Sequence, residues 1–153
     1  MQPDGWSASA RMPAAALPPG ILVTCTPVDG TDWDAAALCA AAAPGRIVNL
    51  CAKRYYAPTP GTPPVTFLRV HGGGAVPRER DVRFFIRVLN RHFAQGGGQQ
   101  PIVVHCTHGQ NRSGYFIVRY LMQRMRAAEA VALFAAARPP GIQRPELLRA
   151  LLG

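Results

Sequence analysis

The feature that most constrains the fold is a short apolar segment that runs directly into a polar loop containing glycine. Residues 101–105 read PIVVH and predict a buried strand, residues 106–111 (CTHGQN) form the loop, and we expect a helix from about Arg112 to Met125. A loop between a strand and a helix N-terminus presents backbone N–H groups and the positive end of the helix dipole to one point. The segment therefore predicts an anion site at the end of a central strand.

The same loop carries reactive groups at a spacing that suits phosphate. Cys106 opens the loop and Arg112 follows six residues later, so both meet one anion if the loop folds around it. A guanidinium binds two phosphate oxygens with its planar fork, and the positive surroundings favour the thiolate of Cys106. We predict that Cys106 attacks phosphorus to form a phosphocysteine, and that Ser113 stabilises the sulfur when this intermediate breaks down.

The rest of the loop is expected to surround the bound phosphate. These substrate-binding residues are Thr107, His108, Gly109, Gln110 and Asn111. His105 is expected to orient the loop from behind, and glycine lets the backbone approach the anion closely. A buried core thiol and an unrelated surface arginine are the simpler interpretation of Cys106 and Arg112. That interpretation leaves unexplained why these residue types occur together between a strand and a helix.

Outside this segment, predicted strands alternate with predicted helices. The strands are expected at Ile21–Cys25, Arg46–Cys51 and Val65–Val70, and the helices at Asp34–Ala43 (capped by Thr31 or Asp32), Arg78–Phe93, Ala127–Ala137 and Pro145–Leu152. This alternation predicts an α/β domain with a central, mostly parallel sheet flanked by helices.

The length of 153 residues suits a single compact domain. We assign residues 21–153 to this domain and residues 1–20, which are rich in proline, alanine and serine, to a loosely ordered lead-in. Trp6 and Met12 are expected to dock on the body. Proline and glycine predict loops at 52–64, 71–77 and 96–100. No apolar run is long enough to cross a membrane, and no signal peptide is expected at the N-terminus.

Charge and cysteine usage bear on the partners. The net charge is +9, almost all of it from arginine, and such an excess attracts polyanions. The chain has four cysteines without the spacing of a zinc site, so we expect no metal and no cofactor. Cys25, Cys39 and Cys51 lie in apolar surroundings and are expected to be buried, inert thiols. Reduced cysteines indicate an intracellular location, nuclear or cytoplasmic.

The string HCTHGQNRSG at 105–114 matches the signature of the cysteine-dependent protein tyrosine phosphatase superfamily. In detail it resembles the branch that acts on RNA 5′ ends, which includes the triphosphatase domain of metazoan mRNA capping enzymes and the baculovirus RNA phosphatase. Four further segments are similar to that branch: 22–27 (LVTCTP), 46–56 (RIVNLCAKRYY), 114–122 (GYFIVRYLM) and 134–148 (FAAARPPGIQRPELL). The resemblance thus covers most of residues 21–152.

The resemblance implies a dual-specificity-like phosphatase fold and a metal-independent RNA 5′-phosphatase. Its substrate would be 5′-triphosphate RNA, with the γ-phosphate as the group removed and the β-phosphate as a further candidate. Lys53 and Arg54 would then bind additional phosphates, although a solvated loop explains them equally well. Tyr55 and Tyr56 are expected to be packing residues. Similar proteins occur in viruses and animals, so the chain is either virus-encoded or cellular; the oligomeric state is left open.

Two departures from the branch bear on the reaction. Asn49 stands where the branch usually has an aspartate, and the segment His71–Arg80 lacks the aspartate that protein phosphatases of this superfamily use as a general acid. The nearest acids, Glu79 and Asp81, are explained by the helix dipole. A phosphoanhydride releases a weak base and needs little protonation, so the absence favours anhydride substrates. A dual-specificity protein phosphatase is the alternative function, and a non-catalytic phosphate-binding protein is a third interpretation.

Overall fold

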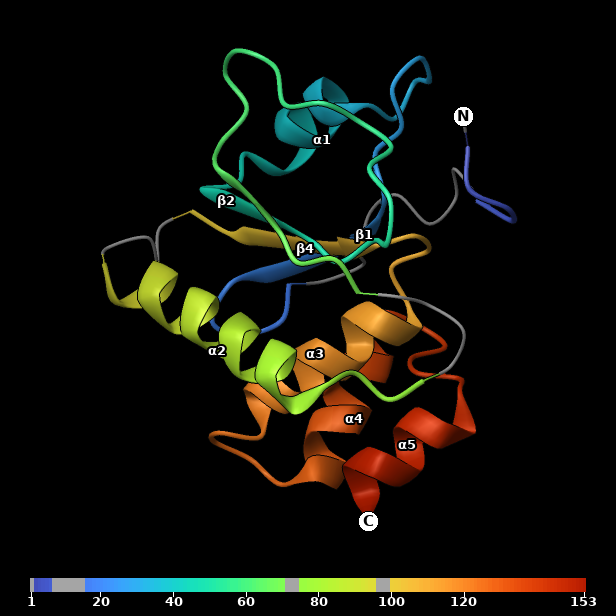
Figure 1. Cartoon of the computed structure of the whole chain (residues 1–153). Helices are drawn as coiled ribbons and strands as arrows, with labels where there is room; N and C mark the ends of the chain where they lie inside the picture. The colour runs from blue at the N-terminus through green and yellow to red at the C-terminus, as the bar shows by residue number, and fades with distance from the viewer. Residues whose placement is uncertain (1, 7–15, 71–74, 96–99) are drawn as a thin grey trace.

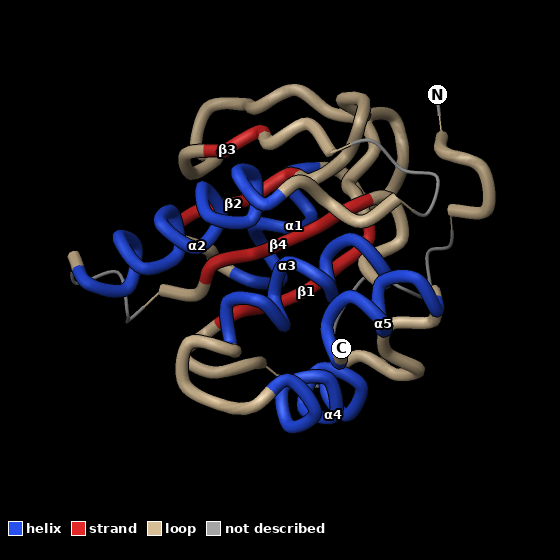
Figure 2. Tube along the Cα trace, turned by 60° about the horizontal axis from the view of Figure 1, so that its bottom comes forward, coloured by secondary structure: helices blue, strands red, loops and turns tan. Residues whose placement is uncertain are grey.

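The computed structural model describes residues 2–6, 16–70, 75–95 and 100–153 of the chain. Within these ranges all strand pairings of the sheet are parallel, in the order β1-β4-β2-β3 (Figure 2). The strands are β1 Ile21–Cys25, β2 Arg46–Asn49, β3 Val65–Phe67 and β4 Ile102–Cys106. The predicted α/β class with a central parallel sheet is confirmed.

The helices cover both faces of the sheet unequally. They are α1 Ala35–Ala42, α2 Glu79–Ala94, α3 Asn111–Leu121, α4 Ala127–Ala137 and α5 Pro145–Leu152. In Figure 1, α1 lies on one side of the sheet and the other four helices lie on the opposite side. Since β4 is flanked by β1 and β2 and leads into α3, the predicted loop lies at the centre of the sheet's carboxyl edge.

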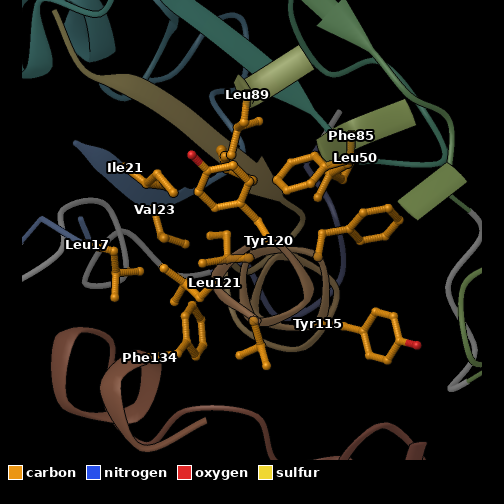
Figure 3. Packing of buried hydrophobic residues seen from close by; sticks show 14 of the residues in the cluster. Leu17, Ile21, Val23, Leu50, Phe85, Leu89, Tyr115, Tyr120, Leu121 and Phe134 are labelled. Atoms are coloured by element: carbon orange, nitrogen blue, oxygen red, sulfur yellow. The ribbon is translucent and has the colours of Figure 1, made fainter. Parts of the chain in front are cut away.

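The alternation of side chains along β4 explains the two layers. Ile102 and Val104 point into the large core that α2, α3, α4 and α5 share, whereas Val103 joins the smaller core with Leu38 of α1. Figure 3 shows the large core, where side chains from strands and helices interdigitate around α3. Both faces of this central strand are buried, so the sequence of β4 is continuously apolar up to His105.

Four predicted boundaries shift, among them the end of β2, which lies at Asn49 and not at Cys51. The N-cap of α1 is Asp34, whose carboxylate accepts a hydrogen bond from the Ala37 N–H at 2.9 Å, whereas the Thr31 hydroxyl donates to the Val28 carbonyl at 2.7 Å. β3 is shorter than predicted because it pairs only with β2, and it ends at Phe67. The helix expected to reach Met125 ends at Leu121 and gives way to turns.

The N-terminal lead-in contributes to the body at two places. Leu17 is 1% exposed and belongs to the large core, and the Trp6 indole N–H donates to the Thr26 carbonyl at 3.0 Å. The rest of the lead-in at 1 and 7–15, Met12 included, and the predicted loops at 71–74 and 96–99, lie outside the described residues. Among the described helices, none has the length and apolarity needed to span a membrane.

Candidate active site

The predicted loop is held between the carboxyl ends of three strands. The Thr26 N–H, after β1, donates to the Thr107 carbonyl at 3.1 Å, and the Leu50 N–H, after β2, donates to the His105 carbonyl at 2.8 Å. Gly109 has a φ of 71°, and a side chain there would collide with the backbone carbonyl of Thr24. Only glycine therefore lets the loop pass this close to β1.

Cys106 lies at the base of the loop with 3% of its surface exposed. Burial alone raises the pKa of a thiol, but here the Arg112 guanidinium, the Ser113 hydroxyl and the backbone N–H groups of Ser113 and Gln110 act against burial. The net result is a Cys106 pKa below the ordinary value of a cysteine. The site thus favours a nucleophilic thiolate, as the strand–loop–helix pattern predicts.

Arg112 is oriented by three oxygen atoms from different segments. One of its terminal nitrogens donates to the Val70 carbonyl at 3.1 Å and to the Leu50 carbonyl at 3.5 Å, and the other donates to the Thr107 hydroxyl at 2.8 Å. These contacts hold the half-buried guanidinium at the loop, where its charge reaches Cys106. Such an arginine is placed to bind an anion enclosed by the loop.

Ser113 is completely buried at the first turn of α3. Its hydroxyl oxygen makes no hydrogen bond of standard geometry with the described residues, but it acts on Cys106 as a donor that lowers the pKa of the thiol. The two observations agree if the hydroxyl lies near the sulfur without ideal alignment. A buried hydroxyl without another partner can donate to a sulfur that carries or releases negative charge.

Behind the loop, buried polar groups fix its base. His105 is fully buried; its Nε2 atom lies 2.8 Å from the Tyr56 hydroxyl and its Nδ1 atom 3.8 Å from the Cys51 sulfur. Burial lowers the pKa of His105 to about 3 and raises the pKa of Cys51 to about 11, so both groups are neutral at pH 7. Asn49 is also buried, and its side-chain oxygen accepts the Cys51 N–H at 2.9 Å. Asn49 therefore serves as a backbone brace.

A residue that the sequence did not single out braces the opposite side of the loop. Arg138, directly after α4, is 5% exposed and donates to the carbonyls of Gly109 at 3.0 Å and His108 at 3.2 Å. The Gln110 side chain donates to the Arg138 carbonyl at 2.9 Å. The sequence offers one indication, a charged residue beside Pro139 in a segment of otherwise small residues. It does not indicate that this residue contacts a loop 29 residues earlier.

The structure redistributes several of the predicted binding residues. The Asn111 side chain accepts the backbone N–H groups of Gln143 and Arg144 at 2.8 and 3.1 Å, so it ties the C-terminal segment to α3. His108 has an exposed side chain, and burial of part of its ring together with Arg112 lowers its pKa. The phosphate loop thus offers mainly backbone groups, Thr107 and Arg112 to an anion.

Lys53 and Arg54 lie in the loop after β2. Lys53 is exposed and forms no side-chain hydrogen bond or ion pair with the described residues. The Arg54 guanidinium lies 4.5 Å from the centre of the Phe67 ring and lines a small hollow with Asn49 and Tyr56. Arg54 is therefore engaged at the β3 side of the edge, and no described contact joins either cation to the phosphate loop.

The remaining cysteines and tyrosines largely follow expectation. None of the four cysteines, all of which the structure describes, forms a disulfide. Cys25 and Cys51 are buried, whereas Cys39 on α1 is half-buried because its helix lies at the surface. Tyr56 is 5% exposed and packs against the His105 ring with a centroid distance of 5.5 Å. Tyr56 is thus a packing residue, as predicted.

Glu79 and Asp81, the two acids at the start of α2, are both paired with arginines. Both oxygens of Glu79 accept hydrogen bonds from Arg119 of α3, at 2.5 and 2.8 Å, and these bonds lower the pKa of Glu79. Asp81 pairs with Arg78 at 3.4 Å. A carboxylate that is stabilised in its ionised form is a poor general acid. The arrangement therefore supplies a nucleophile and an anion clamp, and Glu79 is poorly suited to protonate a leaving group.

Comparison with known proteins agrees with this site. Residues 85–152 match the family described as the dual specificity phosphatase catalytic domain. The fold resembles the solved structures of DUSP15, with a TM-score of 0.72 at 17% identity over 94% of this chain and 86% of that one, and of PTPMT1, with a TM-score of 0.70 at 19% identity over 87% and 88%. The chain therefore has the fold of these phosphatases, and its part at 85–152, which includes the loop, resembles the dual-specificity catalytic domain.

Three kinds of curated protein are similar to this chain in sequence. The chain is 43% identical to the mRNA-capping enzyme of Danio rerio over 86 residues, which is 55% of this chain and 14% of that enzyme. It is 38% identical to the tyrosine-protein phosphatase of Autographa californica nuclear polyhedrosis virus over 82 residues, 52% of this chain and 48% of the viral protein. It is 31% identical to the human RNA/RNP complex-1-interacting phosphatase over 112 residues, 70% and 34%. The chain spans less than half the length of each of these relatives.

Proposed function

We propose that this chain is a polynucleotide 5′-phosphatase that removes the γ-phosphate of 5′-triphosphate RNA, and then the β-phosphate where a diphosphate end remains. The observation that carries the proposal is a site with a nucleophile and an anion clamp, while Glu79, at the start of α2, is held ionised by Arg119. The similarity to the mRNA-capping enzyme of Danio rerio supports the same substrate.

In the proposed reaction, the Cys106 thiolate attacks the γ-phosphorus and forms a sulfur–phosphorus bond. The bond between the γ-phosphorus and the bridging oxygen breaks, and the electron pair leaves with the 5′-diphosphate end of the RNA. Arg112 and the loop N–H groups bind the three outer oxygens as their charge redistributes. Water then attacks the phosphocysteine, the sulfur leaves as a thiolate that Ser113 stabilises, and inorganic phosphate is released.

An anhydride substrate suits this arrangement because of its leaving group. A diphosphate is a weak base and departs without a proton, whereas the alkoxide of serine or the phenoxide of tyrosine gains much more from a general acid. The second candidate is a dual-specificity protein phosphatase. It is supported by the family match at 85–152 and by the similarity to the RNA/RNP complex-1-interacting phosphatase. The two functions differ in substrate and in their need for an acid.

The test compares phosphate release from 5′-triphosphate RNA and from a phosphotyrosine peptide, in EDTA. The wild-type chain, Cys106→Ser and the double variant Glu79→Gln/Asp81→Asn are assayed side by side. We expect release from RNA without a metal, loss of that release in Cys106→Ser, and nearly full activity in the double variant. A preference for the peptide, or dependence of RNA cleavage on Glu79 or Asp81, would reject the proposal in favour of a protein phosphatase.

A further inference from the structure

One face of α2 carries arginines that the proposed reaction does not use. Positions 80, 84, 87 and 91 are spaced so that they lie along one side of a helix, opposite the buried Val82, Phe85 and Leu89. The exposed side has an arginine at three of these positions and Phe84, which is 39% exposed, at the fourth. We call Arg80, Phe84, Arg87 and Arg91 the arginine face.

Most of the positive charge on the arginine face is not neutralised. The acids of α2 are confined to its first turn, where Glu79 pairs with Arg119, and Asp81 lies 3.4 Å from Arg78 and 4.0 Å from Arg80. Arg87 and Arg91 form no ion pair with the described residues, and the Arg87 guanidinium lies 5.9 Å from the centre of the Phe84 ring. An exposed cation stacked on an exposed aromatic ring is a combination that favours nucleic acid.

The far end of the arginine face borders a groove. Phe84, Val88 and Arg91 line one side of it, and Gly45 and Arg46, at the start of β2, line the other. The groove has a volume of about 380 Å³ and receives positive charge from both walls. A hollow of this kind can hold a flat base or a sugar-phosphate segment, and a smooth cationic surface cannot.

The near end of α2 leads to the phosphate loop. A second hollow of about 260 Å³ is lined by Arg69, Val70, Pro77, Arg78 and Asp81, whose carboxylate pairs with Arg78. The Val70 carbonyl is the acceptor that holds Arg112 at 3.1 Å. α2 runs from this region toward the opposite end of the sheet (Figure 1), where it meets the starts of β2 and β4. Its 16 residues extend about 24 Å, enough for several nucleotides.

We propose that the arginine face binds the single-stranded RNA body that follows the 5′ end, with the arginines on successive phosphates and Phe84 stacked on a base. This inference rests on the proposed function, because it assumes that RNA enters the phosphate loop by its 5′ end. Stacking on aromatic residues and charge attraction are both independent of sequence, so the face discriminates RNA length and not base order.

An acidic peptide is the competing partner, and the observations favour RNA. The arginines recur over the whole length of α2, which matches the regular charge of a nucleic-acid strand. The exposed aromatic ring lies within the cationic row, where an acidic peptide has no planar group to place against it. The hollow at the near end of α2 also continues the row toward the phosphate site, as a substrate path requires.

The test measures binding and turnover separately in the full chain. A fluorescent single-stranded RNA of roughly 20 nucleotides with a 5′-hydroxyl reports on the face alone, because it has nothing to hydrolyse. The variant Arg87→Gln/Arg91→Gln removes two arginines of the face, and Arg124→Gln/Arg149→Gln removes two exposed arginines elsewhere as a matched control. We expect the first variant to bind this RNA roughly 10-fold more weakly, and the control to bind like the wild type.

Turnover distinguishes this inference from the proposed function. With a 5′-triphosphate dinucleotide as substrate, Arg87→Gln/Arg91→Gln should retain the wild-type kcat/KM, whereas with the longer triphosphate RNA its KM should rise. Equal binding by both double variants, or tighter binding of a polyglutamate peptide than of RNA, would overturn the inference. If the wild type binds the 5′-hydroxyl RNA through this face but hydrolyses only phosphopeptides, RNA binding by the arginine face is supported and 5′-triphosphate RNA is rejected as the substrate.

Discussion

The charge on a single sulfur depends on two opposing contributions from its surroundings. Burial disfavours the Cys106 thiolate, while Arg112 and donors from Ser113 and Gln110 favour it, and the second group prevails. Arg112 in turn depends on the carbonyls of Leu50 and Val70. The reactivity that we assign to one side chain therefore resides in an assembly of backbone groups from three segments.

Replacing Ser113 should separate the two chemical steps. In Ser113→Ala the sulfur loses a hydroxyl donor in the breakdown of the phosphocysteine, and a hydrogen bond to a charged group is worth about 1.5–3 kcal/mol, so kcat should fall roughly 10- to 100-fold. The first turnover should remain fast, which rapid-quench measurements would record as a burst. Ser113→Thr, which retains the hydroxyl, is the control. A slow first turnover would place the role of Ser113 in the attack instead.

His105 should make the fold sensitive to acid. Its pKa is about 3 in the fold and near 6.5 in the unfolded chain, so below pH 6.5 the unfolded state binds the extra proton. The free energy of unfolding should therefore fall by roughly 1.4 kcal/mol for each pH unit between 6.5 and 3, and this contribution is constant above 6.5. Urea titrations at several pH values measure the slope, and His105→Gln should flatten it. An unchanged slope would assign the acid sensitivity to other groups.

The residues of the loop could be predicted because they are contiguous. Cys106 and Arg112 lie within seven positions, between a recognisable strand and a recognisable helix. Arg138 could not be predicted, since its partners, the carbonyls of His108 and Gly109, are brought to it only by the packing of α4 against α3. Asn111 was predicted to bind substrate because the neighbouring loop residues were. In the structure its side-chain oxygen accepts the Gln143 N–H instead.

At the scale of elements, the segment after α4 acts as a brace for the phosphate loop. Arg138→Met should remove two hydrogen bonds to loop carbonyls and a positive charge that interacts with Cys106. We expect kcat to fall and the pKa of Cys106 to rise, because the thiolate loses a stabilising cation. The pH dependence of iodoacetamide alkylation measures that pKa, a readout that loss of packing alone would not move.

The matched control for Arg138 is Arg124→Met, which removes an exposed arginine between α3 and α4. It should leave both kcat and the alkylation profile unchanged. If Arg138→Met unfolds at the assay temperature, Arg138→Lys keeps a charge while losing the fork that reaches two carbonyls, and its alkylation profile still decides the question. A wild-type profile in a folded Arg138 variant would reduce the residue to a packing role.

Element types were easier to predict than element ends. α2 follows from the helical spacing of Val82, Phe85 and Leu89, and the structure buries all three. The start of α1 was misplaced because Thr31, Asp32 and Asp34 all have side chains that can cap a helix, and local sequence does not rank them. β3 ends early since an edge strand has only one neighbour to pair with, and sequence alone does not reveal the edge.

In the whole molecule, the fold places part of the excess positive charge in a row that leads to the phosphate loop. The sheet places the phosphate loop at its carboxyl edge, and α2 leads away from that edge with its apolar side on the core and its arginines outward. Composition predicted attraction to polyanions but not where they bind, because Arg46 and Arg91 become neighbours only when β2 and α2 are packed together. The net charge of +9 can thus be read from the sequence, whereas the position of the proposed RNA path along α2 depends on the fold.

Salt should separate the path from the phosphate site. For single strands the logarithm of affinity falls by about 0.7 per phosphate contact for each decade of salt, so three contacts on the arginine face add about 2 to the slope. Between about 50 and 200 mM KCl, kcat/KM for a long triphosphate RNA should therefore fall roughly 20-fold more than kcat/KM for a triphosphate dinucleotide. Steady-state assays of both substrates measure the difference, and Arg87→Gln/Arg91→Gln should remove about two-thirds of the added slope because one of the three contacts remains. Parallel salt curves for the two substrates would mean that all of the attraction arises at the phosphate loop, and that the arginines of α2 contribute only to the net charge.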